Sequence, residues 1–209
     1  MKKLFHFEKA ALFISLFIVS CNDDDLKNPA KTNHLKVGDA VYELSSGLLD
    51  NYGPGEDYEG VNLDLLLFSK NLRVSTDNDG EERLIGSGDA VYFEMFTSNS
   101  ASLDNADYIY HETPLPFPIH TFSYGFYAIG WESDENDAED LIEINSGRLT
   151  VEKNGDEYEI FITGKDANGG EVTGYYKGRL QYYDQTANSE VARRNSVKER
   201  TDLRPSDKM

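Results

Sequence analysis

The chain has 209 residues, with 38 acidic against 20 basic side chains and a formal net charge of -18. Such a body repels the phosphates of nucleic acid, and its one basic stretch, residues 193–208, is interleaved with acids, so a nucleic-acid partner is excluded. The same charge disfavours adsorption to an anionic bilayer, so membrane association requires an inserted or covalent anchor.

The first twenty residues have the three zones of a secretory signal peptide. Three lysines near the start precede an apolar run, residues 10–19, and the small residue Ser20 follows it. The run is too short for a membrane-spanning helix, which needs about 20 apolar residues. We therefore predict that residues 1–20 are removed from the mature protein.

Cys21 follows this segment directly and is the only cysteine of the chain, so no internal disulfide can form. Ile18-Val19-Ser20-Cys21 resembles the lipobox of bacterial lipoproteins, in which a peptidase cuts before a cysteine whose sulfur carries a diacylglyceryl group. Ile18 departs from the leucine that is usual there. The resemblance implies palmitate-type acyl chains on Cys21, and two or three such chains attach a protein stably because each buried CH₂ contributes about 0.8 kcal/mol.

Residues 21–36 are expected to form a lipidated, flexible tether. They are polar, contain Pro29 and show no apolar period. Asn22-Asp23-Asp24-Asp25 resembles the acidic export signal of lipoproteins in the Bacteroidota. This resemblance implies a lipid-anchored protein of the outer membrane, displayed on the cell surface, with the periplasmic face as the alternative.

From residue 37 to residue 184, short apolar or aromatic runs alternate with clusters of Gly, Asn, Asp and Pro. This pattern is typical of strands separated by turns. The predicted strands are residues 40–49, 61–69, 90–97, 108–111, 121–131, 141–151, 157–163 and 172–183. We expect one all-β domain over 37–184, a single antiparallel meander of about eight strands that is closed or nearly closed into a barrel, with a two-layer β-sandwich as the alternative.

The last hairpins allow a prediction of strand register. Asn154-Gly155 is a preferred type I′ turn, and pairing outward from it sets Val151 opposite Tyr158. A three-residue loop at 168–170 keeps the apolar faces of the next two strands matched. That loop sets Tyr158 opposite Leu180.

Several strand patterns in this region carry a resemblance to a family. They are Tyr42-Glu43-Leu44 with Gly47, Asn62-Leu63-Asp64-Leu65, Tyr92-Phe93-Glu94, and Val172-Thr173-Gly174-Tyr175-Tyr176-Lys177-Gly178 with Tyr182-Tyr183-Asp184. In these patterns the chain is similar to uncharacterised Bacteroidota surface lipoproteins whose domains look like small lipocalin-type β-barrels. The resemblance covers most of residues 37–184. It implies a fold, because its motifs contain no catalytic chemistry.

The common catalytic motifs are missing from the sequence. It has no G-x-S-x-G, no phosphate-binding G-x-x-x-x-G-K-[ST], no H-E-x-x-H and no second cysteine. His111 and His120 flank a proline-rich stretch and are expected to be exposed loop histidines. We therefore predict a protein that is not an enzyme and that uses no cofactor.

The acidic loops are expected to be solvated and not to bind metal. Six acidic residues lie within 132–140, without the spacing and the glycine of a calcium loop. Asp77-Asn78-Asp79-Gly80 comes closer to that pattern but lacks the closing glutamate. No metal site is predicted.

The predicted strand 121–131 carries aromatic side chains on both faces. Alternation places Phe122, Tyr124 and Phe126 on one face and Tyr127, Ile129 and Trp131 on the other. Tyr127 and Trp131 are candidate ligand-binding residues, because two aromatic rings can form a platform for a sugar or another flat ligand. The simpler interpretation is that they belong to an ordinary barrel core.

The C-terminal segment, residues 185–209, differs from the domain. It has almost no apolar residues. Its basic side chains include Arg193, Arg194, Lys198, Arg200 and Arg204. We expect a disordered tail.

Two functions from different classes remain. The first is a membrane-anchored, non-catalytic binding module for a small ligand, a glycan or a partner protein such as an outer-membrane protein. The alternative is a structural or interaction lipoprotein whose barrel is filled by its own side chains and has no ligand site. An interior cavity of roughly several hundred Å³ favours the first, and a packed interior favours the second.

Overall fold

The computed structural model describes residues 31–76, 82–133 and 141–186. These residues form an all-β domain without an α-helix among them, which confirms the predicted fold class. In chain order the strands are β1 (His34–Val37), β2 (Ala40–Glu43), β3 (Ser46–Gly53), β4 (Val61–Phe68), β5 (Leu72–Thr76), β6 (Glu82–Thr97), β7 (Ala106–Tyr110), β8 (Thr121–Glu132), β9 (Ile142–Asn154), β10 (Glu157–Asp166), β11 (Glu171–Gly178) and β12 (Gln181–Asp184).

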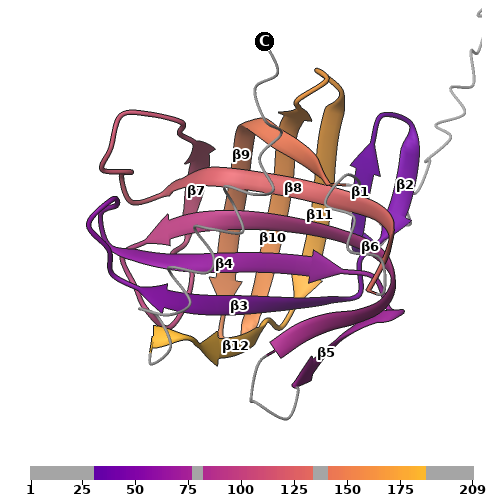
Figure 1. Ribbon diagram of the computed structural model, residues 1–209, viewed down its shortest axis with the longest axis horizontal. Coiled ribbons are helices and arrows are strands. Elements are labelled where there is room, and N and C mark those ends of the chain that lie inside the picture. The colour runs from indigo at the N-terminus through magenta and orange to yellow at the C-terminus, as the bar shows by residue number, and fades with distance from the viewer. Residues whose placement is uncertain (1–30, 77–81, 134–140, 187–209) are drawn as a thin grey trace, which may run out of the picture. The chain divides into compact units, whose positions relative to one another are not determined.

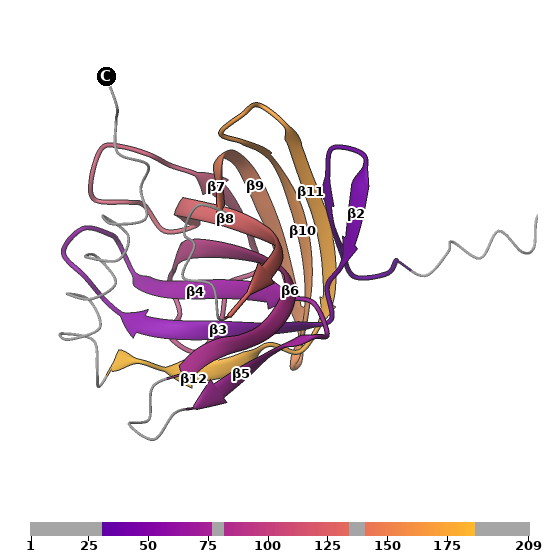
Figure 2. The same ribbon diagram turned by 45° about the vertical axis from the view of Figure 1, so that its right-hand side comes forward.

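The strands form one bent sheet. Its hydrogen-bonded order is β12-β3-β4-β6-β8-β7-β9-β10-β11-β1-β2, and β5 pairs with β6 beside this path. The sheet folds over on itself, so that β3, β4, β6 and β8 cross in front of β9, β10 and β11 (Figure 1, Figure 2). Its two end strands, β12 and β2, do not pair with each other in the described part of the chain. The domain is therefore an open half-barrel.

The finer prediction, a single antiparallel meander of about eight strands that is closed or nearly closed into a barrel, is wrong. The sheet is mixed, because β12 runs parallel to β3 and β7 runs parallel to β8. The predicted strand 172–183 is interrupted at residues 179–180, where the chain leaves β11 and enters β12. Parallel neighbours need a long connection, and between β3 and β12 that connection is nearly the whole domain. Local strand patterns cannot reveal such a return.

β1 begins at His34, within the range expected to be a tether, 21–36. It pairs antiparallel with β2 and β11, and Leu35 is completely buried in the core. A four-residue strand is too short for apolar alternation to stand out in the sequence. The next predicted strand, 40–49, is divided into β2 and β3.

The last two hairpins keep the predicted faces but are shifted in register. β9 and β10 are joined by Gly155-Asp156, with Val151 opposite Ile160 instead of Tyr158. Within this turn only Gly155 has a positive φ, 62°, which is typical of a type II′ turn and not of type I′. The β10–β11 loop has the predicted three-residue length but lies at 167–169. Both shifts amount to two residues, and an even shift leaves every side chain on its face.

The core lies between the two layers of the half-barrel. Nine strands contribute buried apolar side chains to it, for example Leu35, Leu49, Leu65, Phe93, Tyr108, Phe122, Leu149, Ile160 and Val172. Each fully buried side chain of this size contributes about 1.5–3 kcal/mol. A smaller cluster of Leu48, Phe68, Leu72 and Ala90 lies on the opposite face of the sheet.

β8 carries two irregularities in its pairing with β6. One lies where Glu94 and Met95 pair with Tyr124 and Phe122, and the other lies between Gly88 and Ala90. A bulge adds one residue and so changes which side chains share a face. Phe122 packs into the core, whereas Tyr124 lies on the other face. The prediction that these two residues share a face with Phe126 is therefore wrong for Phe122.

Candidate functional site

Several predicted features lie outside the described residues, so they stay predictions. They are the signal peptide with the lipidation site Cys21, the tether up to residue 30, the fragment Asp77-Asn78-Asp79-Gly80, most of the acidic run 132–140 and the C-terminal tail from residue 187. Acylation of Cys21 therefore stays a prediction. In the part of the chain that the structure describes, no helix is long and apolar enough to cross a bilayer. The same residues contain no cluster of three or more His, Cys, Asp or Glu side chains that fits a metal ion.

Tyr127 and Trp131 do not come together. Tyr127 is 3% exposed and lies in the core, where its hydroxyl donates to Asp166 Oδ2 at 3.0 Å. Burial, together with the hydrogen bond and charge of Asp166, raises the pKa of Tyr127 to about 12. Trp131 instead packs against the smaller cluster on the opposite face of the sheet. The two rings therefore share no stacking surface.

The interior of the half-barrel is filled by side chains. The core cluster extends through both layers, and Phe93 of β6 meets Phe122 of β8 edge to face at 5.4 Å between ring centroids. Outside this core, the described residues form a hollow of roughly 550 Å³ along β9 and β10 and another of roughly 670 Å³ beside β1 and β2. Both are lined mainly by polar and charged side chains.

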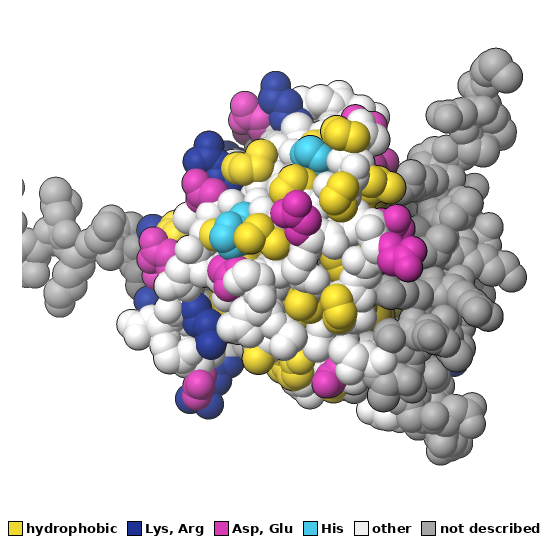
Figure 3. Space-filling model, turned by 90° about the vertical axis from the view of Figure 1, so that its left-hand side faces the viewer, with side chains coloured by type: hydrophobic (Ala, Val, Ile, Leu, Met, Phe, Trp, Pro, Cys, Tyr) yellow, Lys and Arg dark blue, Asp and Glu magenta, His cyan; other side chains and the backbone are white. Residues whose placement is uncertain are grey.

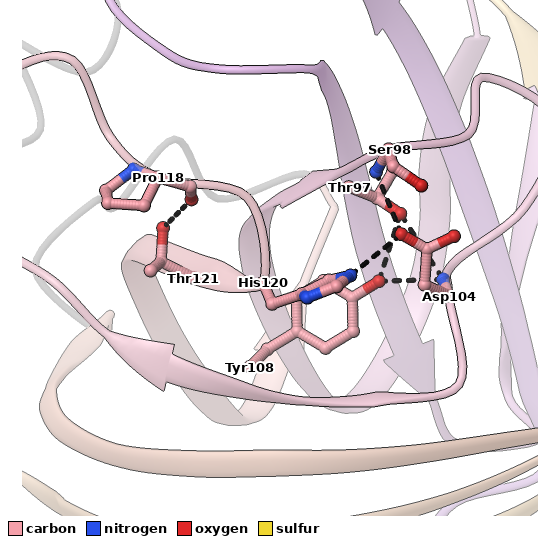
Figure 4. A network of polar contacts seen from close by, with 7 residues as sticks. All are labelled: Thr97, Ser98, Asp104, Tyr108, Pro118, His120 and Thr121. Carbon is pink, nitrogen blue, oxygen red and sulfur yellow. Dashed lines mark hydrogen bonds and ion pairs between the residues drawn. The ribbon is translucent and has the colours of Figure 1, made fainter.

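A hydrogen-bond network ties four chain segments together where β6 ends and β8 begins (Figure 4). His120 Nε2 lies 2.9 Å from Asp104 Oδ2, and the same oxygen accepts a bond from the Ser98 backbone N–H at 2.9 Å. The backbone N–H of Asp104 donates to the Tyr108 hydroxyl at 2.8 Å. That hydroxyl in turn donates to Thr97 Oγ1 at 3.1 Å.

His120 occupies a backbone conformation that side chains other than glycine rarely adopt. Its φ is 62°, in the left-handed region, which costs about 1–3 kcal/mol. Its backbone N–H donates to Phe96 O at 2.7 Å, and its carbonyl accepts a bond from the Ile109 N–H at 3.1 Å. These bonds and the contact with Asp104 hold the residue in place.

The two acidic groups of the network have shifted pKa values. Burial opposes ionisation of Asp104, but hydrogen bonds from Ser98, His120 and Thr97 outweigh it and lower the pKa of this carboxyl. Burial raises the pKa of Tyr108 to about 12. At neutral pH the network therefore contains a carboxylate and a neutral phenol.

A histidine paired with a carboxylate is also part of catalytic triads, in which the second ring nitrogen faces a nucleophile. Among the described residues no serine, threonine or cysteine side chain forms a hydrogen bond with His120 Nδ1. The Tyr108 hydroxyl is already engaged by Thr97 and Asp104. The hydrogen bonds of His120, Asp104 and Tyr108 therefore hold the loops in position.

The network supports an exposed apolar surface, which we call the loop patch. It consists of Ile109, Leu115 and Ile119, which are 45%, 55% and 37% exposed. Figure 3 shows apolar side chains and two histidines grouped on this side of the molecule, with acidic side chains around them. Exposed apolar patches mark interaction sites more often than single exposed apolar residues do.

An aromatic stack braces the loops that carry the patch. Phe96, which is fully buried, lies between Tyr58 at 4.8 Å and Phe117 at 5.2 Å. The same loops are joined by backbone bonds, from the Glu59 N–H to Phe117 O at 2.8 Å and from the Phe117 N–H to Asp57 O at 2.9 Å. The β3–β4 and β7–β8 loops are therefore linked by both stacking and hydrogen bonds.

His111 and His120 both lie in the β7–β8 loop, as predicted, and they are half-buried there. The His111 ring packs against Phe117 at 5.9 Å, and its Nε2 lies 3.2 Å from Pro114 O. The His120 ring packs against Tyr108 at 5.6 Å. The two histidines thus have separate partners in the same loop region.

Comparisons of the chain with protein-family models, with curated proteins and with solved structures find no match in any of the three.

Proposed function

We propose that the mature chain is a lipid-anchored, non-catalytic interaction lipoprotein that contacts a partner protein through the loop patch. Acyl chains on Cys21 provide the anchor, and the resemblance of the N-terminus to Bacteroidota lipoproteins supports an outer-membrane location, displayed on the cell surface. The observation that carries the binding role is the loop patch itself, which consists of three exposed branched side chains on β7 and on the β7–β8 loop, and that loop is fixed by hydrogen bonds and stacked rings.

A partner protein fits this geometry better than a small apolar ligand does. Core side chains pack through the interior, and this supports an interaction protein over a lipocalin-like carrier of a small ligand. Loops that are already fixed lose little conformational freedom on binding, and this improves affinity. Because the chain has a net charge of -18, the best partner has an apolar contact surrounded by Lys and Arg.

The anchor is tested by metabolic labelling with a palmitate analogue in cells that express the full chain. The wild type should become labelled and partition with membranes. A Cys21→Ser variant should lose the label and move to the soluble fraction. An unlabelled wild type, or a Cys21→Ser variant that still carries the label, would reject the anchor.

The loop patch is tested by placing a photo-crosslinking amino acid at position 115 in the lipidated protein on cells. A matched control carries it at position 41, since Val41 is 63% exposed but lies on edge strand β2. A defined partner should be captured from position 115 only. The purified partner should then bind Leu115→Glu at least about tenfold more weakly than Val41→Glu, as expected for a central apolar contact worth about 1.4 kcal/mol. Equal affinities would reject this surface as the binding site.

A further inference from the structure

Two Asn-Gly dipeptides occur in the chain, and they lie at opposite ends of β10 (Figure 2). Asn154-Gly155 is at the turn between β9 and β10, and Asn168-Gly169 is in the loop between β10 and β11. Glycine has no side chain, so its backbone nitrogen can approach the amide carbon of the preceding asparagine without obstruction. Each asparagine can therefore react with its own backbone unless the fold prevents it.

The reaction converts the asparagine into an acid in two steps. At the first dipeptide, Gly155 N forms a bond to Asn154 Cγ, and Nδ2 leaves as ammonia together with the proton of the Gly155 amide. This step closes a succinimide ring. Water then opens the ring at either carbonyl and gives aspartate or isoaspartate, so one water is consumed and one ammonia is released. A hydrogen bond from the attacking N–H opposes the first step, because that bond must break before the nitrogen can attack.

The fold restrains the second dipeptide through a buried carboxylate. The Gly169 N–H donates to Asp166 O at 2.9 Å. The N–H groups of Asn168 and Gly170 donate to Asp166 Oδ1 at 2.9 and 2.8 Å. Asp166 is 6% exposed and accepts a further bond from the Tyr127 hydroxyl at 3.0 Å, which ties the loop to the core. Attack by Gly169 N therefore requires a local opening in which several bonds break together.

The first dipeptide lies at an open turn. Asn154, Gly155 and Asp156 are all exposed, and a Cβ added to Gly155 would meet nothing within 4 Å. The Gly155 N–H forms no hydrogen bond with the described residues. Exposure alone does not separate the two dipeptides, because Asn168 and Gly169 are exposed as well. The difference lies in the attacking nitrogen, which is hydrogen-bonded at Gly169 and not at Gly155.

We propose that Asn154 is a site of spontaneous deamidation and that the loop around Asp166 protects Asn168, although the two dipeptides are identical. The product changes the surface at the end of β9. Asn154 is opposite Glu157 in the β9–β10 ladder and lines the hollow along these strands. Aspartate at position 154 places a second negative charge opposite Glu157, which disfavours the pair.

Isoaspartate has a larger effect, because it adds one carbon to the main chain at the point where β9 enters a two-residue turn. Turns of this length fix the register of the strands that they join, so the lengthened chain should distort the hollow along β9 and β10. The reaction involves neither Cys21 nor the loop patch. Its outcome is therefore independent of the proposed function.

Ageing the purified full mature chain in mildly alkaline buffer tests the proposal. Trypsin cleaves after Lys153, Lys165 and Lys177, so the two dipeptides fall into separate peptides, residues 154–165 and 166–177. Peptide 149–165 is counted with the first, because a modified residue 154 can slow cleavage after Lys153. Mass spectrometry measures the fraction of each peptide in which the amide has become a carboxyl group. The matched control is the same chain unfolded in guanidinium chloride.

For each dipeptide, the rate in the folded chain is divided by the rate in the unfolded chain, which removes the effect of neighbouring residues. The ratio should be close to unity at Asn154. At Asn168 it should be at least about tenfold lower, since even one hydrogen bond at the upper end of its usual strength changes an equilibrium by this factor. Equal ratios at the two dipeptides, or a lower ratio at Asn154, would overturn the proposal.

A Gly155→Ala variant tests which atom attacks. It is compared with the wild type in guanidinium chloride, where the positive φ of Gly155 no longer matters. The added methyl group should slow the reaction at Asn154 and leave the rate at Asn168 unchanged. If the rate at Asn154 were also unchanged, Gly155 N would not be the attacking atom, and the proposed reaction would be wrong.

Discussion

Asp104 and His120 are joined by a 2.9 Å contact between Oδ2 and Nε2, although they are 16 residues apart in the chain. The contact links the β6–β7 loop to the residue that precedes β8. Asp104→Asn removes the charge that Ser98 and His120 both contact. We expect it to lower the free energy of unfolding by about 1–3 kcal/mol, the cost of disrupting hydrogen bonds to a charged group. Urea unfolding of the mature chain measures this change.

Asp107→Asn is the matched control. Asp107 is exposed and accepts bonds from Arg148 at 3.2 Å and Thr150 at 2.6 Å. Because exposed ion pairs contribute little, this variant should lose no more than about 1 kcal/mol. Losses of similar size in both variants would show that the Asp104 network has no special role.

The contribution of Asp104 should depend on acidity. Its pKa in the folded chain is below the ordinary value of 3.8, so the folded state favours the ionised form more than the unfolded state does. The resulting stabilisation is complete above the unfolded pKa and is lost as the pH falls through the lowered folded pKa. The stability difference between the wild type and Asp104→Asn should therefore be constant from about pH 7 to about pH 5 and shrink below pH 3.8. A difference that grows on acidification would contradict this sign.

Two buried tyrosines should ionise late. The pKa values of Tyr108 and Tyr127 are raised from 10.0 to about 12, in both cases chiefly by burial. The folded state thus favours the neutral phenol, and this contribution is complete below pH 10 and is lost as the pH rises through about 12. An alkaline titration followed by phenolate absorbance should show a late phase, and Tyr127→Phe should reduce its amplitude by one tyrosine. If the late phase of this variant were as large as that of the wild type, Tyr127 would not be one of the tyrosines with a raised pKa.

Gly60 is required where the β3–β4 loop enters β4. Its φ is 75°, and an added Cβ would lie 2.2 Å from Thr97 O and 2.8 Å from the Ile119 side chain. Gly60→Ala should lower the free energy of unfolding by about 1–3 kcal/mol and disturb the loop patch. Gly38→Ala separates the two causes, because Gly38 has a φ of 57° with nothing within 4 Å of an added Cβ. Equal losses in thermal unfolding would mean that the close contact contributes nothing.

Leu35 tests whether β1 is part of the folded domain. It is completely buried, so Leu35→Ala should cost about 2–5 kcal/mol in urea unfolding. Lys36→Ala in the same strand has an exposed side chain and should change stability by less than about 0.5 kcal/mol. If Leu35→Ala were as stable as Lys36→Ala, this segment would belong to the tether and not to the folded domain.

The candidate site was the part of the molecule least accessible to prediction. Asp104 is one acidic residue among 38, and nothing in its neighbourhood in the chain points to His120. Tyr108 was placed correctly within a strand, but its hydroxyl bonds to Thr97 and Asp104 follow from how β6 and β7 meet. The one sequence feature that points to this site is the pair of histidines around the prolines. It indicates the loop region but not the residues that His120 contacts.

The all-β class and the matched faces of β9, β10 and β11 can be predicted from the sequence, because side-chain alternation is a local property that survives an even shift in register. The open sheet, the return of β12 to β3 and the placing of Tyr127 and Trp131 on different faces become visible in the folded chain. These outcomes depend on contacts between distant segments and on bulges of a single residue, and neither leaves a periodic trace in the chain.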